Sequence, residues 1–439
     1  MKAKEVILLL IIIAAGVFFY HAYTGNLDVD FYFGEGIFWD FEDFIYEESL
    51  ELEPPFPSRL RIVNSHGKIE IQGTEKQTIT IDFQKKIWRK NEEKAKEVAD
   101  KLKMIVDKDE NRIRISTNRN EFRRKNFDTN FKISIPKDMD IDLENSYGIV
   151  KASDVGEVKI YNRHGEVILS EISGKLDIHN SYEDVEIEDV ESSCWIESKH
   201  STVLVKNVKG GLKIDHSYGK ILLEDISQDV EIESPHTEIF VNGLKGKVDI
   251  QNSYEKITLQ NVGPTTINGH HSRVEVIGVK GGLKIINSYA KADLENIQGN
   301  LDIEGKHFAV SAKKIIGEKI SISSSYEDIE LSDFSAETII TLHNGNSVLD
   351  PGLISHPIQV KSEYGKIKFF WPKGIGCPFE ARAKGGEVKW NLPVEFSFSE
   401  EDRTSIVKAF QQVTDKPSVF LSTSYGDIVV EEQTSDVRL

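Results

Sequence analysis

Cysteine is scarce in this sequence: only Cys194 and Cys377 occur among its 439 residues. If each 18-residue repeat described below forms one coil, about ten coils separate the two cysteines, or roughly 48 Å at ~4.8 Å per stacked strand. Sulfurs that far apart cannot form a disulfide. We therefore expect no intramolecular crosslink, and the two cysteines do not indicate a redox compartment.

Positive charge and catalytic signatures are also lacking. Lysine and arginine total 54 against 72 acidic residues, which gives a net charge of -18. Nucleic-acid binding needs a basic surface, so we expect no nucleic-acid partner. The sequence has no phosphate-binding loop, no Gly-x-Ser-x-Gly elbow and no His-Glu-x-x-His motif. We expect no enzyme activity, no catalytic residue and no cofactor.

Only one long apolar run is present, at residues 6–23, and its length just suffices to cross a bilayer. Lys2 and Lys4 precede it, so the positive-inside rule places the N-terminus in the cytoplasm. A cleaved signal peptide is the alternative, but no small-x-small cleavage site follows Gly16. We predict a cytoplasmic stub and transmembrane helix over 1–24. The rest of this single-pass cell-membrane protein is then extracytoplasmic.

An acidic, aromatic stretch follows at 25–58, with ten acidic residues and no lysine or arginine. Disordered linkers are poor in aromatic residues. We therefore expect this linker to dock its rings on the folded body, with a membrane-proximal or partner-binding strip as the alternative. The basic stretch from Lys85 to Lys125 is a candidate contact for its acidic residues at 28–53.

The sequence does contain a short motif that is repeated at a nearly fixed interval. Asn-Ser-Tyr occurs at 145–147, 180–182, 252–254 and 287–289, and copies carrying histidine alternate with the tyrosine copies. Successive members are 17 to 19 residues apart, which indicates a repeat architecture. The candidate column of surface residues is Tyr147, His164, Tyr182, His200, Tyr218, His236, Tyr254, His271, Tyr289, His307 and Tyr326.

Each repeat carries pairs of apolar residues one position apart, such as Val185 and Ile187, which is the alternation of a short strand. Strands this short bury their inner faces only by stacking on the next coil. The sequence therefore predicts a mainly β fold, a single-stranded parallel β-solenoid of about 18 residues per coil over 141–370. A coil of 36 residues is the alternative, and it would stack tyrosine on tyrosine.

The period fails on both sides of this solenoid. Residues 59–140 predict a first coil at Arg59–Gly73 and then an α+β cap whose helix covers 92–104. Residues 371–432 predict a C-terminal capping region with a last coil at Tyr425. It includes a short helix over 400–413, for which Ser399 is the N-cap. A tail at 433–439 completes the chain.

The cap ends in Phe-Lys-Ile-Ser-Ile-Pro at 131–136, an Asn-Ser-Tyr-Gly coil follows, and Val-x-Gly-x-Leu-x-Ile punctuates the repeats, as at 208–214. Over about residues 60–432 this resembles the putative-adhesin β-helix domain family of bacterial envelope proteins, which is akin to the auto-transporter adhesin head GIN domain. The resemblance implies a right-handed solenoid and an envelope setting, and the family carries no agreed activity. The strict alternation of tyrosine and histidine departs from the family.

Two columns invite a chemical interpretation. Successive histidines lie two coils apart, roughly 9.5 Å, whereas metal–nitrogen bonds are about 2.1 Å, so we expect no metal site. A second column carries acids or amides seven residues after each tyrosine. Its members are Asp154, Asp189, Asp225, Asn261, Asn296 and Asp333. We interpret them as turn residues, with a polysaccharide-cleaving carboxylate pair as the alternative.

We therefore predict a membrane-anchored binding or scaffolding module of the cell envelope, adhesin-like in role. Its partners are the membrane, through residues 6–23, and an envelope protein or glycan. A carbohydrate-active β-helix enzyme is one alternative function, and a self-assembling structural element is another. The column of tyrosines and histidines is either a structural ladder or a binding stripe.

Overall fold

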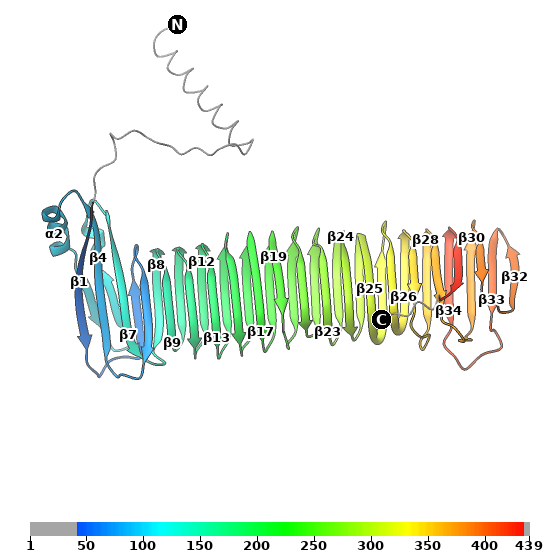
Figure 1. Cartoon of the computed structure of the whole chain (residues 1–439), viewed down its shortest axis with the longest axis horizontal. Helices are drawn as coiled ribbons and strands as arrows, with labels where there is room; N and C mark the ends of the chain where they lie inside the picture. Colours follow the sequence, from blue (N-terminus) through cyan, green and yellow to red (C-terminus); the bar gives the residue numbers. More distant parts are fainter. Residues whose placement is uncertain (1–41, 434–439) are drawn as a thin grey trace, which may run out of the picture.

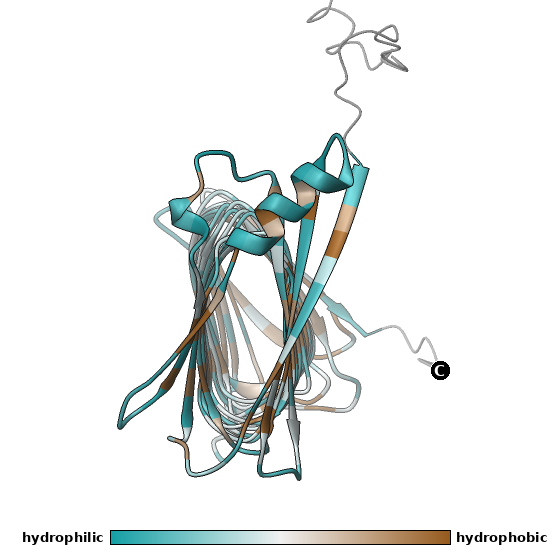
Figure 2. Cartoon of the chain, turned by 90° about the vertical axis from the view of Figure 1, so that its left-hand side faces the viewer, coloured by the Kyte–Doolittle hydropathy of each residue, from teal (hydrophilic) through white to brown (hydrophobic). Residues whose placement is uncertain are grey.

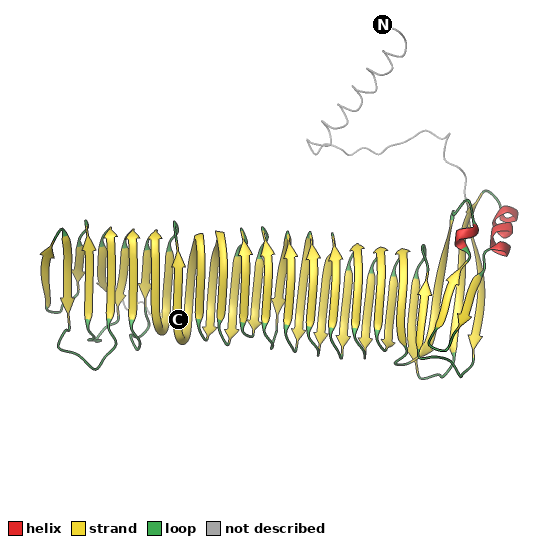
Figure 3. Ribbon diagram, turned by 180° about the vertical axis from the view of Figure 1, so that it is seen from behind, coloured by secondary structure: helices red, strands yellow, loops and turns green. Residues whose placement is uncertain are grey.

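The computed structural model describes residues 42–433, which form one long rod of stacked strands (Figures 1 and 3). The chain winds in flattened coils, about 13 turns of ~18 residues, and each coil contributes one strand to each of two facing sheets. At ~4.8 Å per turn the rod is roughly 60 Å long. Ile160, Ile178 and Ile196 pair from coil to coil at a spacing of 18 residues. The 18-residue coil is confirmed, and the 36-residue alternative is wrong.

Both sheets are parallel along the body of the rod. The first sheet contains β2 (Arg59–Val63), β8 (Asp140–Tyr147), β10 (Val158–His164), β12 (Leu176–Tyr182), β14 (Cys194–Lys199), β16 (Leu212–Ser217), β18 (Val230–Pro235), β20 (Val248–Ser253), β22 (Thr265–His270), β28 (Ile358–Tyr364), β34 (Val419–Tyr425) and β30 (Phe379–Lys384). The second contains β3 (Ile69–Thr74), β9 (Val150–Val155), β11 (Val167–Ile172), β13 (Val185–Val190), β15 (Thr202–Val208), β17 (Gly219–Ile226), β19 (Thr237–Asn242), β21 (Ile257–Val262), β23 (Val274–Lys280), β27 (Ser347–Asp350), β29 (Ile367–Trp371), β35 (Ile428–Glu432) and β31 (Val388–Asn391). Three longer strands continue around the corner and belong to both sheets: β24 (Leu283–Gln298), β25 (Leu301–Ser324) and β26 (Ile329–Asn344).

The core is a set of apolar columns between the two sheets. Ile178, Ile196, Val185 and Val203 are fully buried, and each stacks on its equivalent in the next coil. Burying a side chain of this kind contributes roughly 1.5–3 kcal/mol. Because every coil repeats the same inward positions, each coil is stabilised mainly by its two neighbours.

Antiparallel strands and one α-helix close the N-terminal end. This cap contains β1 (Glu42–Leu52), β4 (Ile79–Arg89), α2 (Glu92–Lys101), β5 (Met104–Lys108), β6 (Ile113–Thr117), the 3-10 helix η1 (Arg119–Glu121) and β7 (Phe127–Pro136). The Asn91 side chain accepts a hydrogen bond from the backbone N–H of Lys94 and so caps α2, which lies beside the rod end (Figure 2). The predicted helix is confirmed, and it ends at Lys101.

Part of the predicted linker is a strand. Residues 42–52 form β1, which pairs antiparallel with β4, so the linker boundary at residue 58 is wrong for this segment. The alternation of Phe44, Tyr46 and Leu50 places these apolar side chains against the core. Glu48 binds the buried Lys85 ammonium at 2.5 Å. The hypothesised contact between the acidic stretch and the basic stretch is thus observed for residues 42–53, the part of the acidic stretch that the structure describes.

The C-terminal helix predicted over 400–413 is wrong. Residues 396–409 form an antiparallel hairpin of β32 (Phe396–Glu401) and β33 (Thr404–Ala409). Asp402 and Arg403 have positive φ angles of 47° and 61°, as both central residues of a type I′ hairpin turn require. Such a turn cannot continue a right-handed helix, so Ser399 lies in a strand and caps no helix.

The predicted membrane anchor at residues 6–23 lies outside the described residues. Between residues 42 and 433, no helix is long and apolar enough to cross a bilayer.

Candidate functional site: the Tyr/His ladder

The predicted aromatic column lies at the corner where each coil passes from the first sheet to the second. From Tyr147 to Tyr326 the rings form one continuous stack, here called the Tyr/His ladder. Successive centroids are 4.5 to 5.7 Å apart, and the ring planes are within 18° of parallel. The structure thus brings together all eleven residues proposed from the sequence. His66 of the first coil extends the stack by one ring, at 4.5 Å from Tyr147.

The ladder is exposed along its outer edge. Tyr182 is 45% exposed and Tyr254 is 55% exposed. Each ring from Tyr147 to His307 has a stacked neighbour on both faces, so the faces are largely covered and the surface left to solvent is the ring edge. Those edges carry tyrosine hydroxyls and imidazole nitrogens, which donate and accept hydrogen bonds. The ladder therefore offers a row of polar groups and few free aromatic faces.

Many ladder residues occupy an unusual backbone conformation. Tyr218, His236 and Tyr289 have positive φ angles of 63°, 56° and 59°. This left-handed conformation is costly for residues other than glycine. It persists here because the stacked rings and the strand pairing on each side fix the corner.

The ladder has a break near its C-terminal end. His343 meets Tyr326 and Tyr364 edge-on, with interplanar angles of 82° and 88°. Its Nδ1 instead lies 2.5 Å from the Glu363 carboxylate, which turns the ring out of the stack. Stacking resumes between Tyr364 and Tyr425. Tyr326 consequently has one face without a parallel neighbour.

Sequence reasoning missed the column that supports the corner from inside. Four ladder tyrosines have an asparagine two residues earlier that points inward and is buried: Asn145, Asn180, Asn252 and Asn287. Asn180 Nδ2 donates to the carbonyl oxygens of Tyr182 and Glu183 at the corner. The fixed spacing of asparagine and tyrosine was visible in the sequence and pointed to this capping role.

His216 interrupts that inner column. It is fully buried, its Nδ1 lies 3.0 Å from the Ser198 carbonyl oxygen, and its Nε2 has no partner among the described residues. Burial disfavours the imidazolium form and lowers the pKa of His216. The unfolded chain therefore binds a proton more readily than the folded protein does.

We expect this histidine to make the rod sensitive to acid. Because the folded pKa of His216 lies below its unfolded value, its contribution to stability is complete above about pH 6.5 and is lost as the pH falls. H216N restores the asparagine common in this column and should flatten the fall of Tm between pH 7.5 and pH 5, measured by calorimetry. An equally steep fall in H216N would contradict this assignment.

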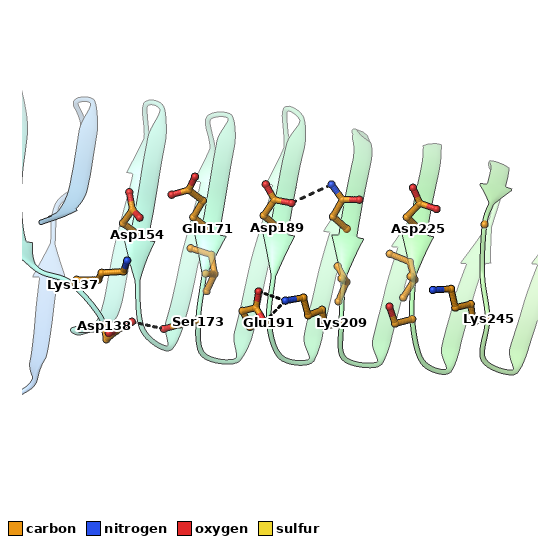
Figure 4. A pocket seen from close by; sticks show the side chains of 16 residues that line it. Lys137, Asp138, Asp154, Glu171, Ser173, Asp189, Glu191, Lys209, Asp225 and Lys245 are labelled. Atoms are coloured by element: carbon orange, nitrogen blue, oxygen red, sulfur yellow. Dashed lines mark hydrogen bonds and ion pairs between the residues drawn. The ribbon is translucent and has the colours of Figure 1, made fainter. Parts of the chain in front are cut away.

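Three members of the column of acids and amides, Asp154, Asp189 and Asp225, line a groove of about 670 Å³ on the second sheet (Figure 4). The members of the column have positive φ angles between 53° and 59° and lie inside strands of the second sheet, where they interrupt the coil-to-coil pairing. The predicted turn position is therefore wrong: these residues bend a strand. The same conformation occurs at Glu171 and Asn207, which the sequence pattern had not included. Interaction with the Asp154 carboxylate on the neighbouring coil raises the pKa of Glu171.

A second aromatic cluster, also missed, lies on the outer face of the first sheet. Tyr161 stacks on His179 at 4.5 Å, and Trp195 meets His179 edge-on. The imidazole is flanked by the carboxylates of Asp177 and Glu197, each 2.9 Å away. These residues belong to three neighbouring coils and do not repeat along the rod, so no periodic pattern could have shown them. Within residues 42–433, no three histidine, cysteine or acidic side chains are arranged to hold a metal ion.

Comparison with known proteins adds little to this geometry. No family model matches the chain, and no curated protein does. A solved structure described as a putative cell adhesion protein from Clostridium sporogenes is similar at 10% identity and a TM-score of 0.16. The match covers 89% of this chain and 100% of that one. A likeness this low carries no argument about function.

Proposed function

We propose that this protein is an adhesin-like binding module of the cell envelope, held at the membrane by residues 6–23 and presenting the Tyr/His ladder outside the cell. The observation that supports the proposal most is the ladder itself, an unbroken row of ring edges along more than half of the rod. A structural stack alone does not require tyrosine, because phenylalanine would stack equally well. The hydroxyls therefore favour a binding role.

The proposed ligand is a polar polymer, such as an envelope glycan, that lies along the ladder. Because the ring faces are covered, recognition relies on hydrogen bonds to hydroxyls and imidazole nitrogens. The polar groups repeat every ~4.8 Å along the axis. A repeating chain can engage many of them at once, so weak single contacts add up to stable retention.

The first test separates stacking from binding at Tyr218 and Tyr254. Each ring contacts two histidines, at 4.8 to 5.2 Å, and an aromatic pair contributes about 0.5–1.5 kcal/mol. Tyr254→Ala should therefore lower the free energy of unfolding by roughly 1–3 kcal/mol in urea titration. A loss below about 0.5 kcal/mol would contradict a structural role for the stack.

Tyr→Phe at the same two positions is the matched variant for binding. It keeps both stacking contacts and removes only the hydroxyl, so stability should change by less than about 0.5 kcal/mol. We expect retention on immobilised envelope glycans to fall several-fold. Unchanged retention would leave the ladder with a structural role alone.

The proposed location has its own test. Protease added to cells whose outer barriers have been opened should remove or shorten the rod, because residues 25–439 are proposed to lie outside. The apolar segment at 6–23 and the preceding Lys2 and Lys4 support this orientation. Full protection of the rod would reverse the topology.

Glycan cleavage in the groove of Figure 4 is a second candidate function, favoured by one observation. Glu171 and Asp154 lie on adjacent coils, about 4.8 Å apart along the axis, and the pKa of Glu171 is raised. Two carboxyl groups at this separation, one of them with a raised pKa, resemble the pair of a retaining glycosidase. If the wild-type protein releases reducing sugar and E171Q does not, the result would favour the enzyme function. No release by the wild-type protein would exclude that function.

A further inference from the structure

The two sheets end unequally at the C-terminal end of the rod. The first sheet continues past the last complete coil, because β33 pairs with β30 and β32 pairs with β33. The second sheet stops at β31, which pairs with β35. The first sheet therefore overhangs the second by two strands (Figure 1). Among the described strands, β31 and β32 each pair on one side only, so this end has one free edge in each sheet.

The overhanging strand β32 is unprotected. All six of its residues are exposed, and Phe396 and Phe398 are 48% and 58% exposed. Their partners in β33 are the buried Ala409 and Val407, so both phenylalanines lie on the inner face of the sheet. Natural proteins cover or charge such edges because an open edge recruits another strand. At the opposite end of the rod, the second sheet ends in the acidic strand β1, which is charged in this way.

The two-strand overhang leaves a step at the C-terminal end of the rod. We propose that a second copy of this chain fills this step, so that two rods join end to end by their C-terminal ends. A twofold axis parallel to the strands exchanges the two sheets and reverses the rod. It brings the overhang of each copy beside the shorter sheet of the other. The two-strand step of one copy matches the two-strand step of its partner, so both sheets become continuous.

Strand direction fits this joint. β32 is antiparallel to β33, which is antiparallel to β30, so β32 runs in the direction of the first sheet. Strands of the second sheet run the opposite way, because the chain reverses at the ladder corner. β32 of one copy therefore meets β31 of the other as an antiparallel pair. The twofold axis forms this pairing twice, so all four free edges of the two copies gain a partner.

Side chains across the joint are complementary. Phe398 on the inner face of β32 meets Trp390 on the inner face of β31 of the second copy, and both are partly exposed in the single chain. On the outer face, the same register places Ser399 opposite Lys389 of the second copy, with Glu401 diagonal to that lysine. A joint between two β32 strands would instead leave β31 and the inner face open. Head-to-tail stacking would bring β32 against β5 and β31 against β1, and there the second sheet overhangs the first by only one strand, so the two-strand overhang finds no matching step and the assembly closes as a dimer.

This joint does not depend on a ligand for the ladder. It gives a rod of about twice the single length, with the two N-terminal caps at opposite ends. If residues 6–23 are anchored as proposed above, such a dimer links two surfaces, and the second copy is then the partner of the adhesin-like role.

Mass measurement on the full-length protein in detergent micelles tests the joint. We expect light scattering to give two chains per particle at micromolar concentration. F396K/F398K adds two charges to exposed positions and should weaken association at least tenfold. Ile316→Lys, at a position that is 68% exposed on the body of the rod, is the control and should remain dimeric. A monomeric wild type, or a dimeric F396K/F398K, would overturn the proposal.

Disulfide trapping tests the geometry. Native Cys194 and Cys377 are buried and do not interfere. Under oxidation, the double variant S399C/K389C should form a covalent dimer, because β32 faces β31 of the second copy. S399C alone should stay monomeric on a denaturing gel. A covalent dimer of S399C alone would show a joint between two β32 strands and would overturn the arrangement.

Discussion

Deleting residues 418–439 is expected to detach the C-terminal cap while leaving the coils before residue 358 folded. The deletion removes β34 and β35, which lie between two other coils: β34 pairs with β28 and β30, and β35 pairs with β29 and β31. Four fully or nearly fully buried side chains are lost, Val419, Leu421, Ile428 and Val430. At roughly 1.5–3 kcal/mol each, this removes on the order of 6–12 kcal/mol of apolar burial.

Hydrogen exchange followed by mass spectrometry measures the outcome. Amides of residues 379–409 should exchange at nearly the rate of an unfolded chain, whereas those of the Tyr/His ladder coils should keep their protection. Deletion of 434–439 alone is the matched control, because it leaves both strands intact, and it should change nothing. Slow exchange at 379–409 in the longer deletion would show that the cap folds without its central coil.

The insertion of β34 and β35 shows what periodicity cannot predict. The coil at Tyr425 resembles every other coil, so the sequence correctly indicated its shape. The neighbours of this coil are set by long-range pairing. The chain first forms the coil at 379–391, and β34 then returns to lie between β28 and β30. A repeat pattern fixes what each coil looks like, and it fixes the order of coils only where they follow one another without interruption.

The hairpin at 396–409 illustrates a different limit. Glu400 to Val413 contains apolar residues whose spacing fits one helical face, and nothing in the local pattern excludes a strand for a segment this short. Pairing of β33 with β30 decides the outcome, because it buries Val407 and Ala409 against the last coil. The tertiary contact overrides the helical preference of Glu and Lys residues.

The Tyr/His ladder was predictable because it depends on spacing alone. Residues 18 positions apart must stack once the coil length is 18, and ring stacking then follows from the corner position. The conformation of that corner was not predictable. In some coils the ladder residue itself takes a positive φ, as Tyr289 does, and in others the following glycine takes it, as Gly148 does. The sequence motif is similar at both kinds of corner.

This difference between corners leads to the last prediction. Gly148 has a φ of 118°, and a Cβ added there would lie 2.2 Å from the carbonyl oxygen of Gly67 in the neighbouring coil. Backbone strain of this kind costs about 1–3 kcal/mol, and a collision with a backbone that cannot move costs a similar amount. Gly148→Ala should therefore destabilise the rod by roughly 2–5 kcal/mol.

Ala290 provides the matched control, because it follows Tyr289 at the equivalent position of a corner where the tyrosine takes the positive φ. Ala290→Gly should cost only the added chain entropy, about 0.5–1 kcal/mol. Urea titration followed by circular dichroism compares the midpoints of the two variants with that of the wild type. A Gly148→Ala midpoint equal to that of Ala290→Gly would mean that the corner can convert from one form to the other, and that the ladder residue before it, Tyr147, can take the positive φ as Tyr289 does.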